Sequence, residues 1–332
     1  MNIAVVGLGY WGPNLVRNFS KIPGVQVKYG CDLSKKNLLK VKKDFPSIIC
    51  TENFSEVLSD SSVEAIAIAT PMSTHFSLVR QALLAGKHVL VEKPMTQTST
   101  EARELISIAK QKKKVLMVGF TFVYSETVRK IKKLIEKNYF GQLYYYDSTR
   151  INLGLIQKDS NVIWDLAPHD LSILGYLIQE KPISLQAFGS SFIGKKEVEV
   201  AHLFLKYRNK MTAHINISWL SPVKIRTILI GGSKKMIVYN DVEPSEKLRV
   251  YDKNVSLPFD KISPFSPAYR SGDILIPHID QKEALLSELQ HFIECIKMNK
   301  TPLTNGTTGL DVIELLEATD LSLVSKSEII LS

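Results

Sequence analysis

The sequence predicts an α/β protein of two domains, with a doubly wound parallel sheet in residues 1–120 and an α+β domain with a mostly antiparallel open sheet in residues 121–332. Three observations predict this class. Short apolar strands alternate with helices in the first domain, as in repeated βαβ units. Long β-rich segments then follow one another between Ile183 and Phe259, separated by short polar turns. A length of 332 residues suits two domains with a sizeable core.

Apolar periodicity and turn residues predict the elements of the N-terminal domain. Ala65–Thr70 is a continuous apolar run, as expected for a strand that is covered on both faces. We expect strands at Asn2–Gly7, Val25–Cys31, Ala65–Thr70, His88–Glu92 and Val115–Gly119, and helices at Trp11–Ile22, Ser34–Asp44, Thr74–Ala85 and Ser99–Gln111. Sheets of this kind bind ligands beyond the carboxyl ends of their strands, so the loops after these strands are candidate functional segments.

The C-terminal domain has a different pattern, in which strands follow strands. We expect strands at Gln142–Ile151, Ser184–Phe192, Val198–Tyr207, Lys210–Ser218, Lys224–Ile230, Met236–Tyr239 and Leu248–Tyr251, and helices at Ser125–Asn138, Trp164–Ile178, Ala284–Met298 and Leu310–Ser325. Residues 260–280 are rich in proline, and we expect them to be irregular.

Composition and charge restrict the class of protein. Hydrophobic residues make up 45% and charged residues 23% of the chain, which is ordinary for a soluble protein, and no apolar run approaches the ~20 residues that span a bilayer. We expect no membrane partner and, because a strand begins at once, no signal peptide. Three scattered cysteines fit neither a disulfide framework nor a metal site, so a reducing cytoplasm is expected.

The net charge of +9 is carried by lysines that are spread along the chain. Neither an aromatic RNA-binding motif nor a recognition helix accompanies them, so we expect no nucleic-acid partner. A positive field would suit an anionic small-molecule substrate.

The glycine pattern Gly7-x-Gly9-x-x-Gly12 lies between the first strand and the first helix, which is the context of a Rossmann dinucleotide site. The first glycine permits the tight turn, the second lets the backbone approach the pyrophosphate, and the third lets helix and strand pack closely. Tyr10 and Trp11 lie within this loop, and the following helix offers free N–H groups to the phosphates. We therefore expect all five residues to bind the cofactor.

Asp32 follows the second strand, twenty residues after Gly12. A carboxylate at this position accepts hydrogen bonds from ribose hydroxyls and repels a 2′-phosphate, so NAD is expected rather than NADP. Lys35 and Lys36 leave the NADP alternative open, because they could attract a phosphate. Thr70 ends the next apolar strand, at the ligand edge of the sheet, and is expected to bind the cofactor. His75 follows and either touches the cofactor or completes a helical turn, and Ser73 or Thr74 is a plausible N-cap.

Glu92-Lys93-Pro94 ends a later strand on the same sheet edge. Oxidation of an alcohol needs a base for the hydroxyl proton and a group that stabilises alkoxide character while hydride leaves. An ammonium at position 93 could hydrogen-bond the reacting oxygen, so we expect Lys93 to be catalytic and Glu92 and Lys93 to lie at the cofactor. A Lys-Pro pair at a strand end is more often a simple turn when it stands alone.

Asp165-x-x-x-His169 contributes the second half of the expected site. Pro168 should lie in the first turn of a helix, since an interior proline would break it, which makes Asp165 the expected N-cap. His169 falls on the same helix face one turn later and suits proton exchange near neutral pH. The alternative is a capping aspartate beside a structural histidine.

Together these residues resemble the glucose–fructose oxidoreductase / inositol dehydrogenase family (Gfo/Idh/MocA) over nearly the whole chain. A late segment also matches: Glu288-Leu289-x-x-Phe292-Ile293, followed by Pro302, Gly306 and Gly309. The resemblance implies NAD-dependent oxidoreduction without a metal. It also implies that the outer face of the C-terminal sheet packs against another subunit, giving a homodimer or a homotetramer.

Residues 148–154 and 164–170 are similar to one branch of this family, the 3-dehydrogenases of UDP-N-acetylglucosamine and of its uronate. In that branch the 3-keto product is converted by an aminotransferase to an amino sugar for surface polysaccharide or lipid A. The resemblance implies that Tyr124, Arg150, Asn152 and His169 bind the substrate. The planar guanidinium of Arg150 would suit a carboxylate or a diphosphate, and an ion pair on a surface strand is the alternative. The chain departs from the branch after Tyr124, where Ser125-Glu126 replaces Asn-Pro.

The expectation is thus oxidation of a secondary hydroxyl, at C3 of a UDP-N-acetylhexosamine. Lys93 would stabilise the alkoxide, Asp165 would orient the pair, and His169 or alternatively Lys93 would take the proton. Two other functions stay open: inositol or free-sugar oxidation (or keto-sugar reduction) within the same family, and a nicotinamide-binding regulator, which would be expected to lack the lysine or the histidine.

Overall fold

The computed structural model of the chain describes residues 1–154, 160–193, 197–256 and 268–331. It divides into two compact units. The first comprises Met1–Ser125 and Lys282–Glu314, and the second comprises Glu126–Gln281 and Leu315–Ser332. From the sequence, we expected residues 121–332 to form one domain. In the structure, residues 282–314 belong to the N-terminal unit.

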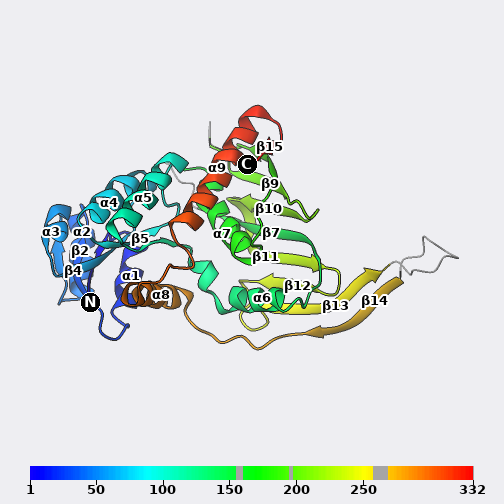
Figure 1. The fold of residues 1–332 in the computed structure, drawn as a ribbon, viewed down its shortest axis with the longest axis horizontal. Coiled ribbons are helices and arrows are strands. Elements are labelled where there is room, and N and C mark those ends of the chain that lie inside the picture. Colours follow the sequence, from blue (N-terminus) through cyan, green and yellow to red (C-terminus); the bar gives the residue numbers. More distant parts are fainter. Residues whose placement is uncertain (155–159, 194–196, 257–267, 332) are drawn as a thin grey trace. The chain divides into compact units, whose positions relative to one another are not determined.

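The first unit contains a six-stranded parallel sheet in the order β3-β2-β1-β4-β5-β6 (Figure 1). This confirms the predicted doubly wound sheet, and the strand order reverses between β1 and β4, where such sheets bind nucleotides. The strands are β1 (Asn2–Val6), β2 (Gln26–Cys31), β3 (Ile49–Thr51), β4 (Val63–Ile68), β5 (His88–Glu92) and β6 (Leu116–Gly119). The three-residue β3 was not expected.

Helices accompany this sheet and begin at local capping signals. They are α1 (Gly12–Phe19), α2 (Lys35–Asp44), α3 (Phe54–Ser59), α4 (Met72–Leu84), α5 (Ser99–Lys112), the 3₁₀ helix η1 (Thr121–Tyr124) and α8 (Ala284–Met298). Thr98 and Glu101 form a capping box at the start of α5. The expected cap of α4 is wrong: the helix begins at Met72, directly after Pro71, and no side chain caps it. α8 packs against α1 and η1.

The second unit is built on a nine-stranded sheet in the order β14-β13-β12-β11-β7-β10-β9-β8-β15. All neighbours in it are antiparallel except β7 and β10, which confirms the predicted mostly antiparallel sheet. The strands are β7 (Leu143–Leu153), β8 (Ser184–Ser190), β9 (Val200–Lys206), β10 (Thr212–Ser218), β11 (Leu220–Gly232), β12 (Met236–Asn240), β13 (Leu248–Ser256), β14 (Ala268–Leu275) and β15 (Ile329–Ile330).

Strand β14 contradicts the prediction that residues 260–280 are irregular, because residues 268–275 pair with β13. Residues 257–267, including Phe259, lie outside the described residues. The remaining helices are α6 (Glu126–Glu136), α7 (Val162–Leu177) and α9 (Gly306–Ser325). Within the described chain, no helix is long and apolar enough to cross a bilayer.

Helix α7 packs on one face of this sheet, against β7, β9 and β10, and α6 packs beside it (Figure 1). Its start differs from the prediction. Asn161 is the N-cap and accepts hydrogen bonds from the N–H groups of Ile163 and Trp164, so Pro168 lies inside the helix instead of in its first turn. The helix starts at residue 162 because Asn161 satisfies two of its N–H groups. It continues past Pro168, although the proline cannot make its backbone hydrogen bond.

The opposite face of the sheet carries exposed aromatic side chains. Tyr145, Phe188 and Phe204 belong to β7, β8 and β9, and they are 37%, 55% and 45% exposed. His202 and His214 stack on each other in the same layer, with ring centroids 5.6 Å apart, and His214 Nδ1 lies 3.0 Å from Asp147 Oδ2. These residues form an apolar surface with a polar centre.

Candidate cofactor and catalytic site

At Gly7 and Gly12, the loop between β1 and α1 lies so close to neighbouring backbone that a side chain would not fit. Gly7 has φ +87°, and a Cβ atom on it would lie 2.6 Å from the backbone of Ala69. A Cβ atom on Gly12 would lie 2.1 Å from the carbonyl oxygen of Gly7. Gly9 has no atom within 4 Å of its Cβ position. The three glycines therefore match the three expected roles: turn, open approach and close packing.

The N-terminus of α1, which follows this loop, has no side-chain cap. Trp11 is the N-cap and makes no capping hydrogen bond, a proline follows in the first turn, and the first turn has no acidic residue. Tyr10 is 91% exposed, and its ring stacks loosely on Trp11. Free helix N–H groups beside an open glycine are the features that bind a pyrophosphate.

Asp32 holds the glycine loop in place. Its carboxylate accepts hydrogen bonds from Leu8 N at 2.6 Å, from Ser34 N at 2.7 Å and from Asn37 Nδ2 at 3.2 Å. A carboxylate has about four acceptor positions, so these three donors leave capacity for a ribose hydroxyl. The sequence predicted the ribose contact but not this role in shaping the loop.

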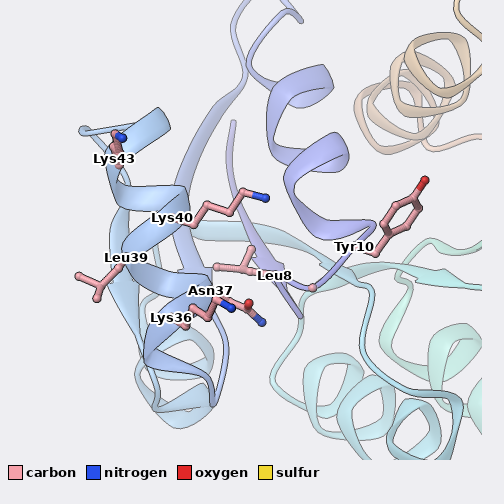
Figure 2. A pocket seen from close by; sticks show the side chains of 8 residues that line it. Leu8, Tyr10, Lys36, Asn37, Leu39, Lys40 and Lys43 are labelled. Atoms are coloured by element: carbon pink, nitrogen blue, oxygen red, sulfur yellow. The ribbon is translucent and has the colours of Figure 1, made fainter.

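A shallow hollow lies between the glycine loop and α2. Figure 2 shows Lys36, Asn37 and Lys40 on the α2 side of this hollow and Leu8 at its base. Ammonium groups beside the loop add positive potential where a dinucleotide would place its phosphates. The glycine cradle, the uncapped N-terminus of α1 and Asp32 thus fit a bound NAD molecule.

His75 connects two loops at the carboxyl edge of the sheet. Its Nε2 lies 2.8 Å from the carbonyl oxygen of Thr70 and its Nδ1 lies 2.8 Å from that of Pro94, and the side chain is 1% exposed. Burial lowers the pKa of His75, and the charge of Lys93 lowers it further, while the two carbonyl contacts oppose the shift. His75 is therefore a buried link between the loops after β4 and β5, an arrangement that neither sequence alternative described.

Glu92 and Lys93 close β5, the strand that pairs with β4 and β6. The carboxyl group of Glu92 lies over Gly119, whose Cβ position is 3.1 Å from Glu92 Cδ. Burial raises the pKa of Glu92 to about 7, although the charge of Lys93 opposes this shift. The first unit thus brings the glycine loop, Thr70, Glu92 and Lys93 to one edge of the sheet.

In the second unit, Asp165 and His169 lie one turn apart on α7, as predicted. Asp165 Oδ2 accepts a hydrogen bond from Trp219 Nε1 at 3.1 Å. Trp219 is buried, and its carbonyl oxygen accepts the N–H of Gly154, close to Asn152. Trp219 was not found from the sequence, because its partner lies 54 residues away and no motif marks it.

Arg150 does not have the surroundings expected of a substrate ligand. It is 4% exposed, and its Nε donates to Asp170 Oδ2 at 2.6 Å. Ser148 Oγ donates to the other carboxylate oxygen of Asp170, also at 2.6 Å. The guanidinium thus forms a buried ion pair that joins β7 to α7, as in the ion-pair alternative, although the pair does not lie at the surface.

Tyr124 also differs from its prediction. It is fully buried, its hydroxyl lies 3.2 Å from Thr304 Oγ1, and its ring packs 5.6 Å from that of His291. These contacts anchor η1 within the first unit, so Tyr124 is a packing residue there. Glu288, which the sequence marked only as part of a late motif, lies next to η1 and accepts a hydrogen bond from Thr121 Oγ1 at 2.7 Å.

No group of three or more His, Cys, Asp or Glu side chains in the described ranges is arranged to hold a metal ion. The first unit thus has a dinucleotide cradle and the ammonium group of Lys93 at one sheet edge. The second unit has the carboxylate of Asp165 and the imidazole of His169 one turn apart on α7.

Comparison with known proteins gives two matches to one family. Residues 1–120 match the model described as "Oxidoreductase family, NAD-binding Rossmann fold", and residues 128–238 match the "GFO/IDH/MocA C-terminal domain". Together they cover well over half of the chain.

Individual relatives are distant but extend over most of the chain. UDP-N-acetylglucosamine 3-dehydrogenase from Acidithiobacillus ferrooxidans is 24% identical over 94% of both chains, and its crystal structure aligns with a TM-score of 0.82 over 98% of both. The scyllo-inositol 2-dehydrogenase (NAD(+)) of Bacillus subtilis is 26% identical over 93% of this chain and 91% of its own. An oxidoreductase from Agrobacterium radiobacter, crystallised with NAD+, L-tartaric acid and magnesium, aligns with a TM-score of 0.83 at 17% identity, over 99% of this chain and 98% of its own. At these identities the solved structures establish the shared fold.

Proposed function

Because this chain belongs to the GFO/IDH/MocA family of NAD-dependent oxidoreductases, we propose that it oxidises a secondary hydroxyl of a nucleotide-activated sugar, at C3 of UDP-N-acetylglucosamine or its uronate. The observation that carries the proposal is Lys93 at the carboxyl end of β5, on the same sheet edge as the glycine loop. An ammonium at this edge would lie beside a nicotinamide bound there, which supports the proposal.

Each residue of the proposed site would have a separate role. Gly7, Gly9, Gly12 and the α1 N-terminus hold the pyrophosphate, and Asp32 binds the adenosine ribose. The bound cofactor supplies the hydride acceptor. Lys93 hydrogen-bonds the substrate oxygen and stabilises its alkoxide character during the reaction.

His169 takes the hydroxyl proton in this proposal, and Lys93 is the alternative acceptor. Asp165 orients α7 side chains through its hydrogen bond to Trp219. Asn152, close to the same tryptophan, is the substrate ligand retained from the sequence analysis, whereas Arg150 and Tyr124 are left out because both are buried in other contacts.

Two facts support the sugar-nucleotide substrate. The similarity to a UDP-N-acetylglucosamine 3-dehydrogenase extends over 94% of both chains, and the net charge of +9 would attract a diphosphate. The comparable similarity to a scyllo-inositol 2-dehydrogenase favours a cyclic polyol as the second candidate substrate.

A substrate panel tests the proposal. The chain is incubated with NAD and, separately, UDP-N-acetylglucosamine, its uronate, scyllo-inositol and myo-inositol. NADH is followed by absorbance and the keto product by mass spectrometry. We expect turnover with a UDP-sugar and a product lighter by two hydrogens. Turnover with an inositol alone would replace the sugar-nucleotide proposal with the polyol alternative.

Two variants test the catalytic assignment within that assay. Lys93→Met and His169→Ala should each lower kcat/KM by about 100-fold or more, the usual range for loss of acid–base or oxyanion-stabilising groups. Lys130→Met, on helix α6, is the matched control for loss of a positive charge. Full turnover in both site variants would overturn the assignment.

We also propose that the chain works as a cytoplasmic homodimer or homotetramer. The support is the exposed aromatic surface formed by Tyr145, Phe188 and Phe204, which is unusual on a face in contact with water. Sedimentation of the wild type and of a Phe188→Lys/Phe204→Lys variant would test this, since a monomeric wild type contradicts it.

A further inference from the structure

The first unit contains a buried carboxyl group that the proposed reaction does not use. Glu288, on α8, is fully buried, and its Oε2 accepts the hydroxyl of Thr121. Its Oε1 is also buried and has no hydrogen-bond partner among the described residues. An ionised carboxylate oxygen without a donor is very costly in such a place. The geometry therefore favours a neutral carboxylic acid at position 288.

Glu92 lies close to this group. Its carboxyl group packs on Gly119, two residues before Thr121, and its charge acts on Glu288. Burial, followed by the charge of Glu92, raises the pKa of Glu288 well above its ordinary value. Burial raises the pKa of Glu92 only to about 7. Glu92 is thus the member of the pair that ionises near neutral pH, while Glu288 keeps its proton.

The charged groups around the pair define what its ionisation does. Lys93 adjoins Glu92 and lowers the pKa of its carboxyl group. His75 contacts the carbonyl of Pro94, and burial lowers its pKa. Thr121 carries no charge. The cluster of Glu92, Lys93 and Glu288 therefore changes from neutral to a net charge of +1 when Glu92 takes up a proton.

We propose that Glu92 distinguishes the oxidised from the reduced cofactor by losing a proton when the oxidised form binds, with Glu288 as its permanently neutral neighbour. Oxidised nicotinamide carries a positive charge that reduced nicotinamide lacks. A ring that binds at this sheet edge would favour the carboxylate of Glu92 when oxidised and tolerate the carboxylic acid when reduced. The inference depends on NAD binding by this unit and not on the identity of the sugar substrate.

Isothermal titration calorimetry of the full chain tests the inference. NAD and NADH are titrated in two buffers of different ionisation enthalpy at several pH values. NAD binding should release up to about half a proton at pH 7, where Glu92 is half ionised, and almost none at pH 9. NADH should release clearly less than NAD at pH 7. Both ligands share the pyrophosphate and the adenosine, so their difference reports the charge of the ring. Equal release by NAD and NADH in the wild type would overturn the proposal.

Three variants identify the group that loses the proton. Glu92→Gln should abolish the difference between NAD and NADH. Glu288→Gln should preserve it, because an amide is neutral like the carboxylic acid that it replaces. Glu294→Gln, on an exposed position of the same helix, is the matched control. The assignment to Glu92 would be contradicted if the difference in proton release between NAD and NADH persists in Glu92→Gln. It would also be contradicted if that difference disappears only in Glu288→Gln. If Glu92→Gln does not fold, the pH dependence of the wild type decides.

These outcomes are separable from those of the substrate panel. If the chain oxidises no sugar, NAD and NADH can still differ in the number of protons they release. If they do not differ, the chain can still oxidise a sugar. The two proposals can therefore fail independently.

Discussion

The cofactor edge of the first unit and the α7–β7 layer of the second unit reach their functional geometry by different means. At the cofactor edge, backbone atoms would be the principal ligands of the proposed NAD site, and glycines create the space. In the α7–β7 layer, buried side chains such as Arg150 and Asp170 hold the helix on the sheet. A site whose ligands are backbone atoms can therefore be predicted from a short sequence motif. A site built from side-chain pairs cannot, because the pairing depends on strand register and helix rotation.

The largest effect should come from breaking the side-chain layer. Arg150→Met leaves Asp170 buried without its cation, so the free energy of unfolding should fall by about 3–5 kcal/mol. Urea denaturation measures it. Arg226→Met removes a more exposed ion pair with Asp241 and should cost less than about 1 kcal/mol. A stable Arg150→Met protein with a raised KM would instead support the original substrate-binding expectation.

A smaller effect should come from crowding the backbone site. Gly12→Ala places a Cβ atom 2.1 Å from the Gly7 carbonyl oxygen, so the loop must shift, at a cost of about 2 kcal/mol of stability, and NADH should bind weakly. Among the described residues, Gly9→Ala meets no atom within 4 Å of its new Cβ, so it should fold normally and still lose NADH affinity. Thermal unfolding and NADH fluorescence titration separate the two. Wild-type NADH binding by Gly9→Ala would contradict the assigned pyrophosphate approach.

Asp32→Ala tests the carboxylate that joins loop and ribose. Loss of its negative charge should reduce the preference for NAD over NADP by about tenfold, equivalent to ~1.4 kcal/mol. The ratio of the two dissociation constants is the measurement. Unchanged selectivity would mean that Asp32 only shapes the loop through Leu8 and Ser34. Asp44→Ala, at the far end of α2, is a matched control.

The smallest effect concerns the side-chain caps of helices α5 and α2. Thr98→Ala removes the capping box of α5 and should lower stability by about 1 kcal/mol without changing NADH affinity. Ser34→Ala removes a longer capping contact of 3.5 Å on α2, and its effect should be smaller still. Chemical denaturation ranks them. The reverse ranking would show that loop geometry at Asp32, and not the cap, fixes the start of α2.

The sequence predicted those features whose signals are local. β5 and α8 have the predicted bounds, His88–Glu92 and Ala284–Met298, because each is a clear apolar pattern between turn or cap residues. The start of α7 was misplaced, because Pro168 was taken as a first-turn residue and Asn161 was not recognised as a cap. Strand β14 was missed because its residues are exposed on both faces and show no alternation.

The site was predictable to the extent that its residues follow strands. The glycines, Asp32 and Lys93 lie at strand ends, so the doubly wound sheet alone brings them to one edge. The partner of Arg150 lies twenty residues away on another element, and only the register of β7 under α7 shows the ion pair. The link made by His75 also depends on two loops meeting, which no spacing rule predicts.

The first unit is assembled from two separated stretches of chain, 1–125 and 282–314. During synthesis, the ribosome therefore finishes the whole parallel sheet long before α8 exists. Until then, the surface of α1 and η1 that α8 covers is exposed, and Leu289 and Phe292 have not yet been made. More than 150 further residues must be synthesised before α8 can pack on the first unit and complete its core. We expect this interval, and not the glycine loop, to be when the growing chain most needs a chaperone.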